Sequence, residues 1–184
     1  MEDTLSRDQQ VFLLDLARRT ISFYLEKGKD LKEKTDDPAL LEKRGAFVTL
    51  KVDDELRGCI GYPLPHKSLF QTIIDCAIAA ASQDFRFAAI KKEELPRLNI
   101  EISVLTLPRK VKDVSEIKIG EHGIILSKGP HRGLLLPQVP VEWDWDLETY
   151  LNHGCLKAGL AEEEWKKGAT IEIFSAQVFS ESFP

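Results

Sequence analysis

The stretch ELRGCIGY places a thiol, Cys59, between two glycines and two residues after Arg57. In an extended strand the side chains alternate, so Arg57 and Cys59 would share one face, while Leu56, Gly58 and Ile60 would share the core face. A guanidinium beside a thiol favours the reactive thiolate. The spacing therefore suggests a nucleophile or acid that acts on a small anionic substrate.

The residues around the thiol suggest a place for that substrate. Gly58 has no side chain and would let a ligand or another backbone come close. Gly61 can adopt a positive φ, so the strand would turn sharply at this point. Such a turn can point several N–H groups into a small concavity that binds anions. We therefore expect Gly58, Ile60 and Gly61 to contact the substrate.

A structural role for Cys59 is the competing interpretation. Cysteine is among the residues most often buried, and the glycines would then serve a tight fold of the chain. A catalytic thiol also needs a base, and the four histidines, His66, His122, His131 and His153, have no telling spacing from it. They form no metal-binding pattern either, so the sequence predicts no metal site. The residue types leave both interpretations open.

Three further side chains are candidates for the same site. Asp84 and Arg86 follow an apolar helix, where they would either hold a phosphate-bearing group or bridge each other locally. Glu101 lies in an alternating strand and would point away from the core, toward Arg57 if the two strands are neighbours. It would either transfer protons or be an ordinary exposed carboxylate.

The segment LLLPQVPVEWDWD offers a second group of candidates. Gln138 can donate and accept hydrogen bonds, and Glu142 beside Trp143 would be partly desolvated, as in a general base. Trp143 and Trp145 are large and apolar, and we expect them to pack in the interior.

Composition limits the class of protein. The chain has 184 residues, a net charge of −5 and three cysteines without a CxxC pair. The acidic balance disfavours nucleic-acid binding, and the cysteine usage favours a reducing compartment. Neither a leader-like start nor an apolar run of about 18 residues is visible, so we expect a cytoplasmic protein.

The elements that would position these residues alternate between helices and strands. Helices are predicted after Ser6, after Ser68 and over 146–158, and strands over 46–52, 55–61, 99–107, 123–137 as a hairpin, and 169–181. In the first helix Val11, Leu14, Ile21 and Leu25 would form the buried face, and in the last Leu147, Leu151 and Leu156. Cys76 would be a core residue, and residues 27–44 a charged connection with a short helix after Pro38. Antiparallel strands mixed with helices in this order indicate an α+β fold.

The chain resembles the AMMECR family, also called AmmeMemoRadiSam system protein A. The resemblance rests on LRGCIG at 56–61, GAFVTL at 45–50, AAASQDFRF at 79–87, ISVLT at 102–106, and the segments 134–151 and 155–160. It implies a single AMMECR-type domain over 1–184. The implied fold is α+β, with a mostly antiparallel sheet, flanking helices and two unequal lobes around a groove that LRGCIG helps to line.

The resemblance also implies partners, namely a Memo-like protein and a radical-SAM protein, although the family has no established activity. Three scattered cysteines cannot hold an iron–sulfur cluster, so no cofactor is expected. Two hypotheses follow. The chain is either an enzyme that uses Cys59 with Arg57 and Glu101 or Glu142, or a non-catalytic binding module of the same system. Its binding residues would be Gly58, Ile60, Gly61, Asp84, Arg86 and Gln138.

Overall fold

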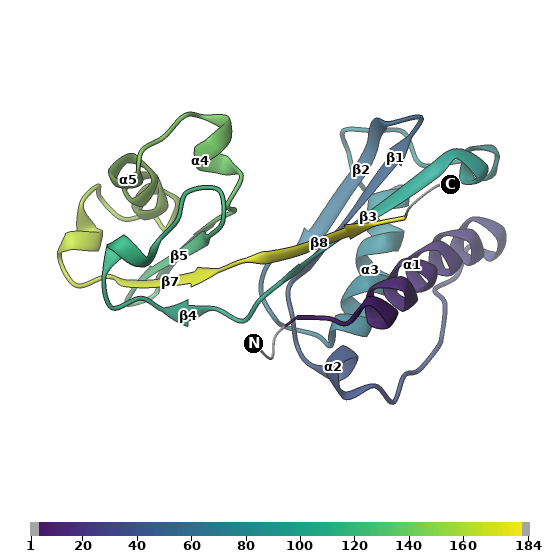
Figure 1. Cartoon of the computed structure of the whole chain (residues 1–184). Coiled ribbons are helices and arrows are strands. Elements are labelled where there is room, and N and C mark those ends of the chain that lie inside the picture. Colours follow the sequence, from purple (N-terminus) through teal and green to yellow (C-terminus); the bar gives the residue numbers. More distant parts are fainter. Residues whose placement is uncertain (1–3, 182–184) are drawn as a thin grey trace. The chain divides into compact units, whose positions relative to one another are not determined.

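The computed structural model describes residues 4–181. The chain folds into two compact units of unequal size. The first unit runs to Leu105 and includes the chain again from Gln177, and the second unit is Thr106–Ala176. Each unit combines helices with one four-stranded sheet, which confirms the predicted α+β fold (Figure 1).

The first unit is a sheet with helices packed on one face. Its sheet has the strand order β2-β1-β3-β8, in which β2 is an edge strand. Its elements are α1 (Arg7–Lys27), α2 (Pro38–Leu41), β1 (Ala46–Val52), β2 (Glu55–Tyr62), α3 (Leu69–Ser82), the 3₁₀ helix η1 (Lys92–Arg97), β3 (Leu98–Leu105) and β8 (Ala176–Ser180). The side chains of β1 alternate between buried and half-buried, so one sheet face meets α1 and α3 and the other does not.

Short-range signals in the sequence account for the ends of these elements. The capping box of Ser6 and Gln9 opens α1, as predicted, and Gly28 closes it at a φ of 63°. The β1–β2 hairpin turns at Asp53 and Asp54, whose φ angles of 51° and 65° fit a tight two-residue turn.

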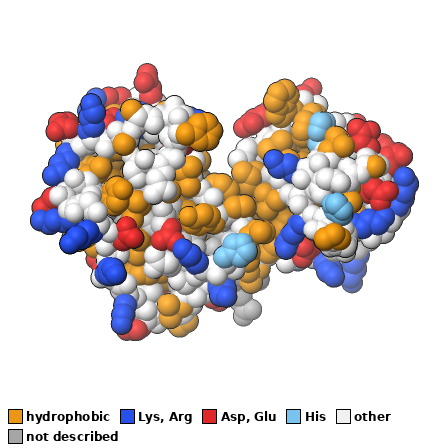
Figure 2. Space-filling model, turned by 180° about the vertical axis from the view of Figure 1, so that it is seen from behind, with side chains coloured by type: hydrophobic (Ala, Val, Ile, Leu, Met, Phe, Trp, Pro, Cys, Tyr) orange, Lys and Arg blue, Asp and Glu red, His pale blue; other side chains and the backbone are white. Residues whose placement is uncertain are grey.

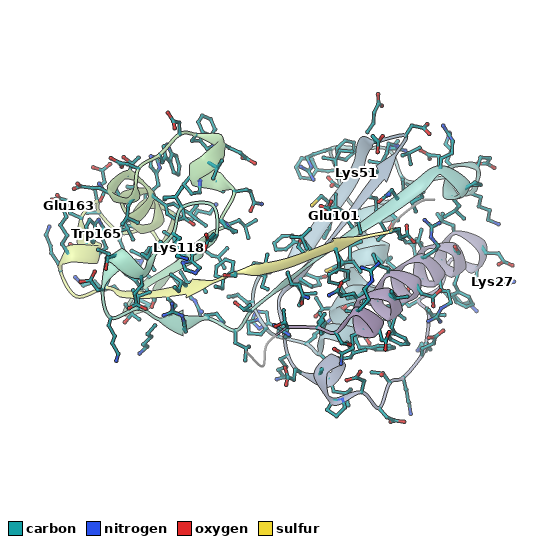
Figure 3. All side chains as sticks on the ribbon, viewed as in Figure 1. Lys27, Lys51, Glu101, Lys118, Glu163 and Trp165 are labelled. Carbon is teal, nitrogen blue, oxygen red and sulfur yellow. The ribbon has the colours of Figure 1, made fainter. Side chains whose placement is uncertain are left out.

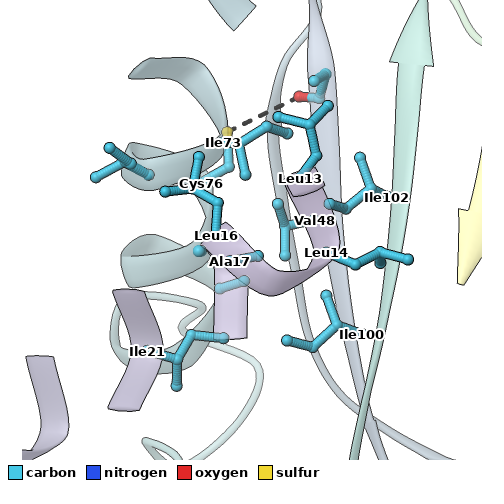
Figure 4. Close-up of a cluster of buried hydrophobic side chains, with 14 of the residues drawn as sticks. Leu13, Leu14, Leu16, Ala17, Ile21, Val48, Ile73, Cys76, Ile100 and Ile102 are labelled. Carbon is cyan, nitrogen blue, oxygen red and sulfur yellow. Dashed lines mark hydrogen bonds between the residues drawn. The ribbon is translucent and has the colours of Figure 1, made fainter. Parts of the chain in front are cut away.

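The buried face of α1 differs from the predicted one. Leu14 and Ile21 are buried, but Val11 is 50% exposed. The core contacts come instead from the neighbouring stripe of Leu13, Leu16 and Ala17, which pack with α3 and the sheet (Figure 4). The apolar stripe of a helix is broad, so the spacing of apolar residues predicted the middle of the buried face only to within about one residue.

Cys76 is a core residue of α3, as predicted. Its side chain is fully buried and donates a hydrogen bond to the carbonyl oxygen of Ala46 at 3.8 Å (Figure 4). Burial raises the pKa of this thiol to about 12, so it stays protonated and inert at neutral pH.

Most of the connection between α1 and β1 is exposed and lacks regular structure apart from α2, the short helix expected after Pro38. Two residues tie it to the core. Leu40 is buried, and buried Arg44 donates to the carbonyl oxygen of Leu105 at 3.2 Å.

The second unit has an antiparallel sheet of order β4-β7-β5-β6. Its elements are β4 (Arg109–Lys110), η2 (Val114–Glu116), β5 (Gly123–Lys128), β6 (His131–Leu135), α4 (Val139–Glu142), α5 (Leu147–Lys157), η3 (Glu164–Lys166) and β7 (Thr170–Phe174). In α5, Leu151 is buried as predicted. Leu156 is exposed, and Tyr150 and Cys155 fill the core instead.

The last predicted strand is in fact two strands. The run 169–181 breaks at Ser175, whose N–H donates to the hydroxyl of Thr106 at 2.9 Å. The strand before the break, β7, belongs to the sheet of the second unit, and β8 belongs to that of the first. Between residues 4 and 181 no helix combines the length and apolarity that crossing a membrane would require.

Candidate functional site

A bulge at Arg57 changes which side chains share a face of β2. Gly58 lies opposite Leu50 and Leu56 lies opposite Lys51, so Arg57 has no opposite residue on β1. Leu56 therefore lies on the same face as Cys59 and is 40% exposed. The predicted alternation, with Leu56 in the core, is wrong for this reason.

The guanidinium of Arg57 is bound to Glu94 rather than placed beside the thiol. Its Nε and Nη2 donate to the two carboxylate oxygens of Glu94 at 2.9 and 3.2 Å, and its Nη1 donates to the carbonyl oxygen of Ala88 at 3.2 Å. Such a two-point pair fixes the guanidinium in orientation. The structure does not support the expectation that Arg57 and Cys59 act as neighbours.

The two glycines that flank the thiol serve packing. A Cβ on Gly58 would lie far inside van der Waals contact with the carbonyl oxygen of Ala80, so α3 packs directly on the strand at this point. A Cβ on Gly61 would overlap the ring of Phe47. Ile60, between them, faces the core and packs against it.

The predicted turn at Gly61 is also wrong. Gly61 is not among the residues with positive φ, and it pairs with Phe47 in a strand that continues to Tyr62. Because the strand does not turn there, its N–H groups do not converge on an anion in the way we expected.

The backbone of Cys59 is held by a charged pair from the turn after α3. Its N–H donates to Oδ2 of Asp84 at 2.9 Å, and its carbonyl oxygen accepts from Nη2 of Arg86 at 3.2 Å. Arg86 also donates to both oxygens of Asp84, at 2.9 and 2.7 Å. The pair satisfies the outward N–H and carbonyl of Cys59 as a neighbouring strand would.

Asp84 is a structural carboxylate in this arrangement. Its side chain is 2% exposed, and the hydrogen bond from Arg86 holds its pKa well below the usual range, helped by the N–H of Cys59. Of the two interpretations that the sequence left open, local bridging is the one observed. Arg86 still exposes about half of its side chain.

The thiol of Cys59 is partly exposed and lies directly opposite Thr49. Because the N–H and carbonyl of Cys59 point outward to Asp84 and Arg86, the two residues form a closely spaced pair without mutual backbone hydrogen bonds. The Thr49 hydroxyl donates to Sγ at 3.2 Å. We call the helix-free side of this sheet, with Thr49, Lys51, Cys59 and Glu101, the Cys59 face.

Glu101 lies on the Cys59 face opposite Thr49, but its partner is Lys51 and not Arg57. The Lys51 ammonium lies 3.3 Å from the Glu101 carboxylate, and both side chains are about one-third exposed (Figure 3). The face therefore presents a thiol, a hydroxyl and a weak ion pair side by side.

The turn at residues 84–87, which we call the Phe85 turn, presents an unburied aromatic ring. The N–H of Phe87 donates to the carbonyl oxygen of Asp84 at 3.0 Å, and the N–H of Arg86 donates to Oδ1 of Asp84 at 3.2 Å. The Arg86 guanidinium lies 5.3 Å from the centre of the Phe87 ring. Phe85, in contrast, is 96% exposed. We did not single it out from the sequence, where the only signal was an apolar residue within a polar turn.

Gln138 and Glu142 belong to the second unit, whereas the other predicted site residues belong to the first. Gln138 is the N-cap of α4 and makes no side-chain capping bond, and Glu142 is the last residue of that helix. Both side chains are exposed, and Trp143 is 68% exposed. The expectations of a desolvated Glu142 and a packed Trp143 are therefore wrong.

Neither the surface hollows nor the grouping of ionisable side chains supports a catalytic centre at Cys59. Three surface hollows have volumes of about 700, 380 and 210 Å³, and none of these three is lined by Cys59. The smallest is lined by Tyr62, Leu64, His66, Lys67 and Thr72. Within the described residues, His, Cys, Asp and Glu side chains do not gather in threes that could hold a metal ion. On the face shown in Figure 2, basic and acidic side chains are interspersed.

Comparison with known proteins shows the family. The model of the AMMECR1 family matches residues 14–179. A protein of Methanopyrus kandleri is 47% identical and covers 100% of this chain and 94% of its own length. A protein of Nanoarchaeum equitans is 44% identical, with 92% of this chain and 98% of its own length covered.

A solved structure agrees with this assignment. The crystal structure of an uncharacterised protein from Pyrococcus horikoshii is similar with a TM-score of 0.72 and 43% identity, over 94% of this chain and 91% of that chain. The resemblance inferred from the sequence segments is thereby confirmed. The chain belongs to the AMMECR1 family.

Proposed function

We propose that this protein is a binding module whose recognition site is the Phe85 turn together with the adjoining Cys59 face. The observation that carries the proposal is the 96% exposure of Phe85 on a turn with fixed backbone bonds. A phenylalanine that contacts water on nearly all its surface forgoes about 1.5–3 kcal/mol of burial free energy. A partner that covers the ring would recover this free energy.

The turn is organised in advance of binding. Asp84 ties it to the N–H of Cys59, and Arg86 ties it to the carbonyl of the same residue. The N–H of Ile90 donates to the carbonyl oxygen of Ala81 at 2.8 Å, which holds the chain beyond the turn against the end of α3. A rigid aromatic anchor loses little conformational entropy on binding, which is the usual property of an interface hot spot.

Under this proposal Cys59 is an attachment point of the turn and a contact on the face, and not a nucleophile. The segments LRGCIG and AAASQDFRF then form one structural unit, since the first supplies the strand edge and the second supplies the pair that holds it. The partner that the family resemblance suggests is a Memo-like or a radical-SAM protein.

Phe85→Ala should weaken binding to that partner more than tenfold, because hot-spot aromatics contribute about 2 kcal/mol or more. The free energy of unfolding should not fall, since the ring is 96% exposed and gains almost no burial on folding. Titration calorimetry with the purified Memo-like and radical-SAM proteins measures the first effect, and urea unfolding measures the second.

Val11→Ala is the matched control, because it removes an exposed apolar side chain from α1, on the side of the sheet opposite the Cys59 face, and should leave affinity unchanged. Unaltered affinity of the Phe85→Ala protein would refute the recognition site. Failure of both candidate proteins to bind the wild type would refute the proposed partner.

A Cys59-assisted enzyme is the second candidate, and one contact favours it. The Thr49 hydroxyl that donates to Sγ at 3.2 Å would also stabilise a thiolate. Glu101, which lies opposite Thr49 on β3 and two strands from Cys59, would then accept the proton by way of solvent, and Lys51 would attract a small anionic substrate. Arg57 has no part in this version, because Glu94 already binds it.

Cys59→Ser separates the two candidates. In a host that lacks its own copy of the gene, a binding module predicts that the serine variant restores function and retains partner affinity within about twofold. Loss of function with full partner affinity and unchanged unfolding would instead favour catalysis by the thiol. Thr49→Val, which removes the donor to Sγ, should reproduce that loss only if the thiol is catalytic.

A further inference from the structure

Three aromatic rings of the second unit form a stack between α4 and α5. The rings of Trp145 and His153 are nearly parallel, with centroids 3.9 Å apart and an angle of 8° between their planes. Trp143 stacks on Trp145 with a centroid distance of 6.4 Å and an angle of 23°. Trp145 packs against the core of the unit, and Trp143 is 68% exposed. The stack therefore ends in an indole that is open to solvent.

The backbone around the stack is fixed by hydrogen bonds. The N–H of Trp143 donates to the carbonyl oxygen of Val139 at 3.2 Å, and that of Trp145 donates to Pro140 at 2.8 Å. Asp146 then caps α5 by accepting from the N–H of Thr149 at 2.8 Å. The backbone that carries the exposed indole is thus fixed between α4 and α5, the two helices of the second unit labelled in Figure 1.

The segment of the chain that carries the stack has charged side chains of one sign only. Residues 133–156 contain no lysine or arginine and four acidic residues, Glu142, Asp144, Asp146 and Glu148. Two of the four have other tasks, since Asp146 caps α5 and Glu148 lies 2.7 Å from Lys166. Glu142 and Asp144 are exposed and flank Trp143 directly in the chain. Gly120 lies near Val141, since a Cβ built on it would come within 3.2 Å of that side chain, and Lys118 in the same loop is paired with Glu121 at 3.2 Å.

We propose that this surface, the Trp143 platform (Trp143, Trp145, His153, Glu142 and Asp144), binds an arginine-bearing segment of a partner protein. A cation is attracted to the face of an indole, and tryptophan is the best aromatic residue for this contact. The two exposed carboxylates that flank Trp143 in the chain add to the attraction. Arginine fits better than lysine, because its planar guanidinium stacks on the indole and donates in a fork to a carboxylate.

The same charges argue against other occupants. Two exposed carboxylates repel the phosphates of a nucleic acid. A second copy of this chain carries the same net charge of −5, so the two copies repel each other overall. The inference extends beyond the proposed function, because it concerns residues of the second unit and does not involve Phe85.

Titration of the full chain with a fluorescein-labelled peptide of alternating arginine and glycine tests the proposal. We expect saturable binding that weakens with salt and that alters the tryptophan fluorescence. Trp143→Ala should weaken it about fivefold or more, and Trp143→Phe by less, because phenylalanine keeps a π-face. Glu142→Gln combined with Asp144→Asn should weaken it and reduce its salt dependence.

The test has two controls and one further measurement, sedimentation. Val178→Ala, an exposed apolar truncation in β8, should bind like the wild type, and a peptide with glutamine in place of arginine should not bind. Absence of saturable binding, or equal affinity of the Trp143→Ala protein, would overturn the proposal. Sedimentation that shows self-association dependent on Trp143 would also overturn it, in favour of a second copy as the occupant.

Discussion

Replacing Gly58 by alanine is expected to lower the free energy of unfolding by about 3 kcal/mol, the upper part of the range for overpacking. The added methyl group would overlap the carbonyl oxygen of Ala80, which belongs to the backbone of a buried helix. On the other side, Gly58 is paired with Leu50 in the sheet, so the strand cannot move away without breaking its ladder. Urea unfolding followed by circular dichroism measures the change.

Gly129→Ala is the control for this substitution. Gly129 has a φ of 58°, and a Cβ there would meet nothing within 4 Å. Alanine should therefore lose only about 1 kcal/mol, from the left-handed backbone and not from a clash. If Gly58→Ala costs no more than the control, direct packing of α3 on the strand does not explain this glycine. Gly58→Ala should also weaken Phe85-dependent binding, because it displaces α3 and the Phe85 turn follows α3 directly.

The Asp84 carboxylate should make stability depend on pH at the acid end. Arg86 lowers the pKa of Asp84 in the folded chain below its value of about 3.9 in the unfolded chain. The unfolded state therefore binds the proton more readily, and the stabilisation is complete above about pH 4 and declines as the pH falls below it. Urea unfolding between pH 7 and pH 2 should show this decline.

Asp84→Asn should remove the part of this pH dependence of stability that comes from residue 84. At pH 7 we expect a loss of about 2 kcal/mol, the range for hydrogen bonds to a charged group, because the asparagine cannot accept the same set of charge-assisted bonds. Amide hydrogen exchange offers a local measure. The N–H of Cys59, which donates to Asp84, should exchange faster in the variant, while that of Ile102 in the sheet interior should change only as global stability does.

Asp36→Asn serves as the control, since Asp36 is exposed in the connection before α2 and should leave both stability and its pH dependence unchanged. If the free energy of unfolding falls equally with pH in the Asp84→Asn variant and the wild type, the Asp84–Arg86 pair does not stabilise the fold.

Local chemistry was enough to predict much of the first unit. The hairpin at Asp53 and Asp54, the capping box at Ser6 and the burial of Cys76 depend on residues within a few positions of each other or on the apolar character of one helix. The family was also recognisable, because its segments occur in order along nearly the whole chain. These features require no knowledge of which distant segments meet.

The chemistry around Cys59 depended on distant segments, and several predictions from sequence were wrong there. A bulge at Arg57 inserts one residue without leaving a pattern in the sequence, and it moves every side chain before it to the other face. The partners of Arg57 and Cys59, namely Glu94 and Asp84, are 37 and 25 residues away. Which charges pair across such distances is settled when the helices pack on the sheet. The same packing leaves Phe85 and Trp143 in water, although their apolar character alone would have placed both in the interior.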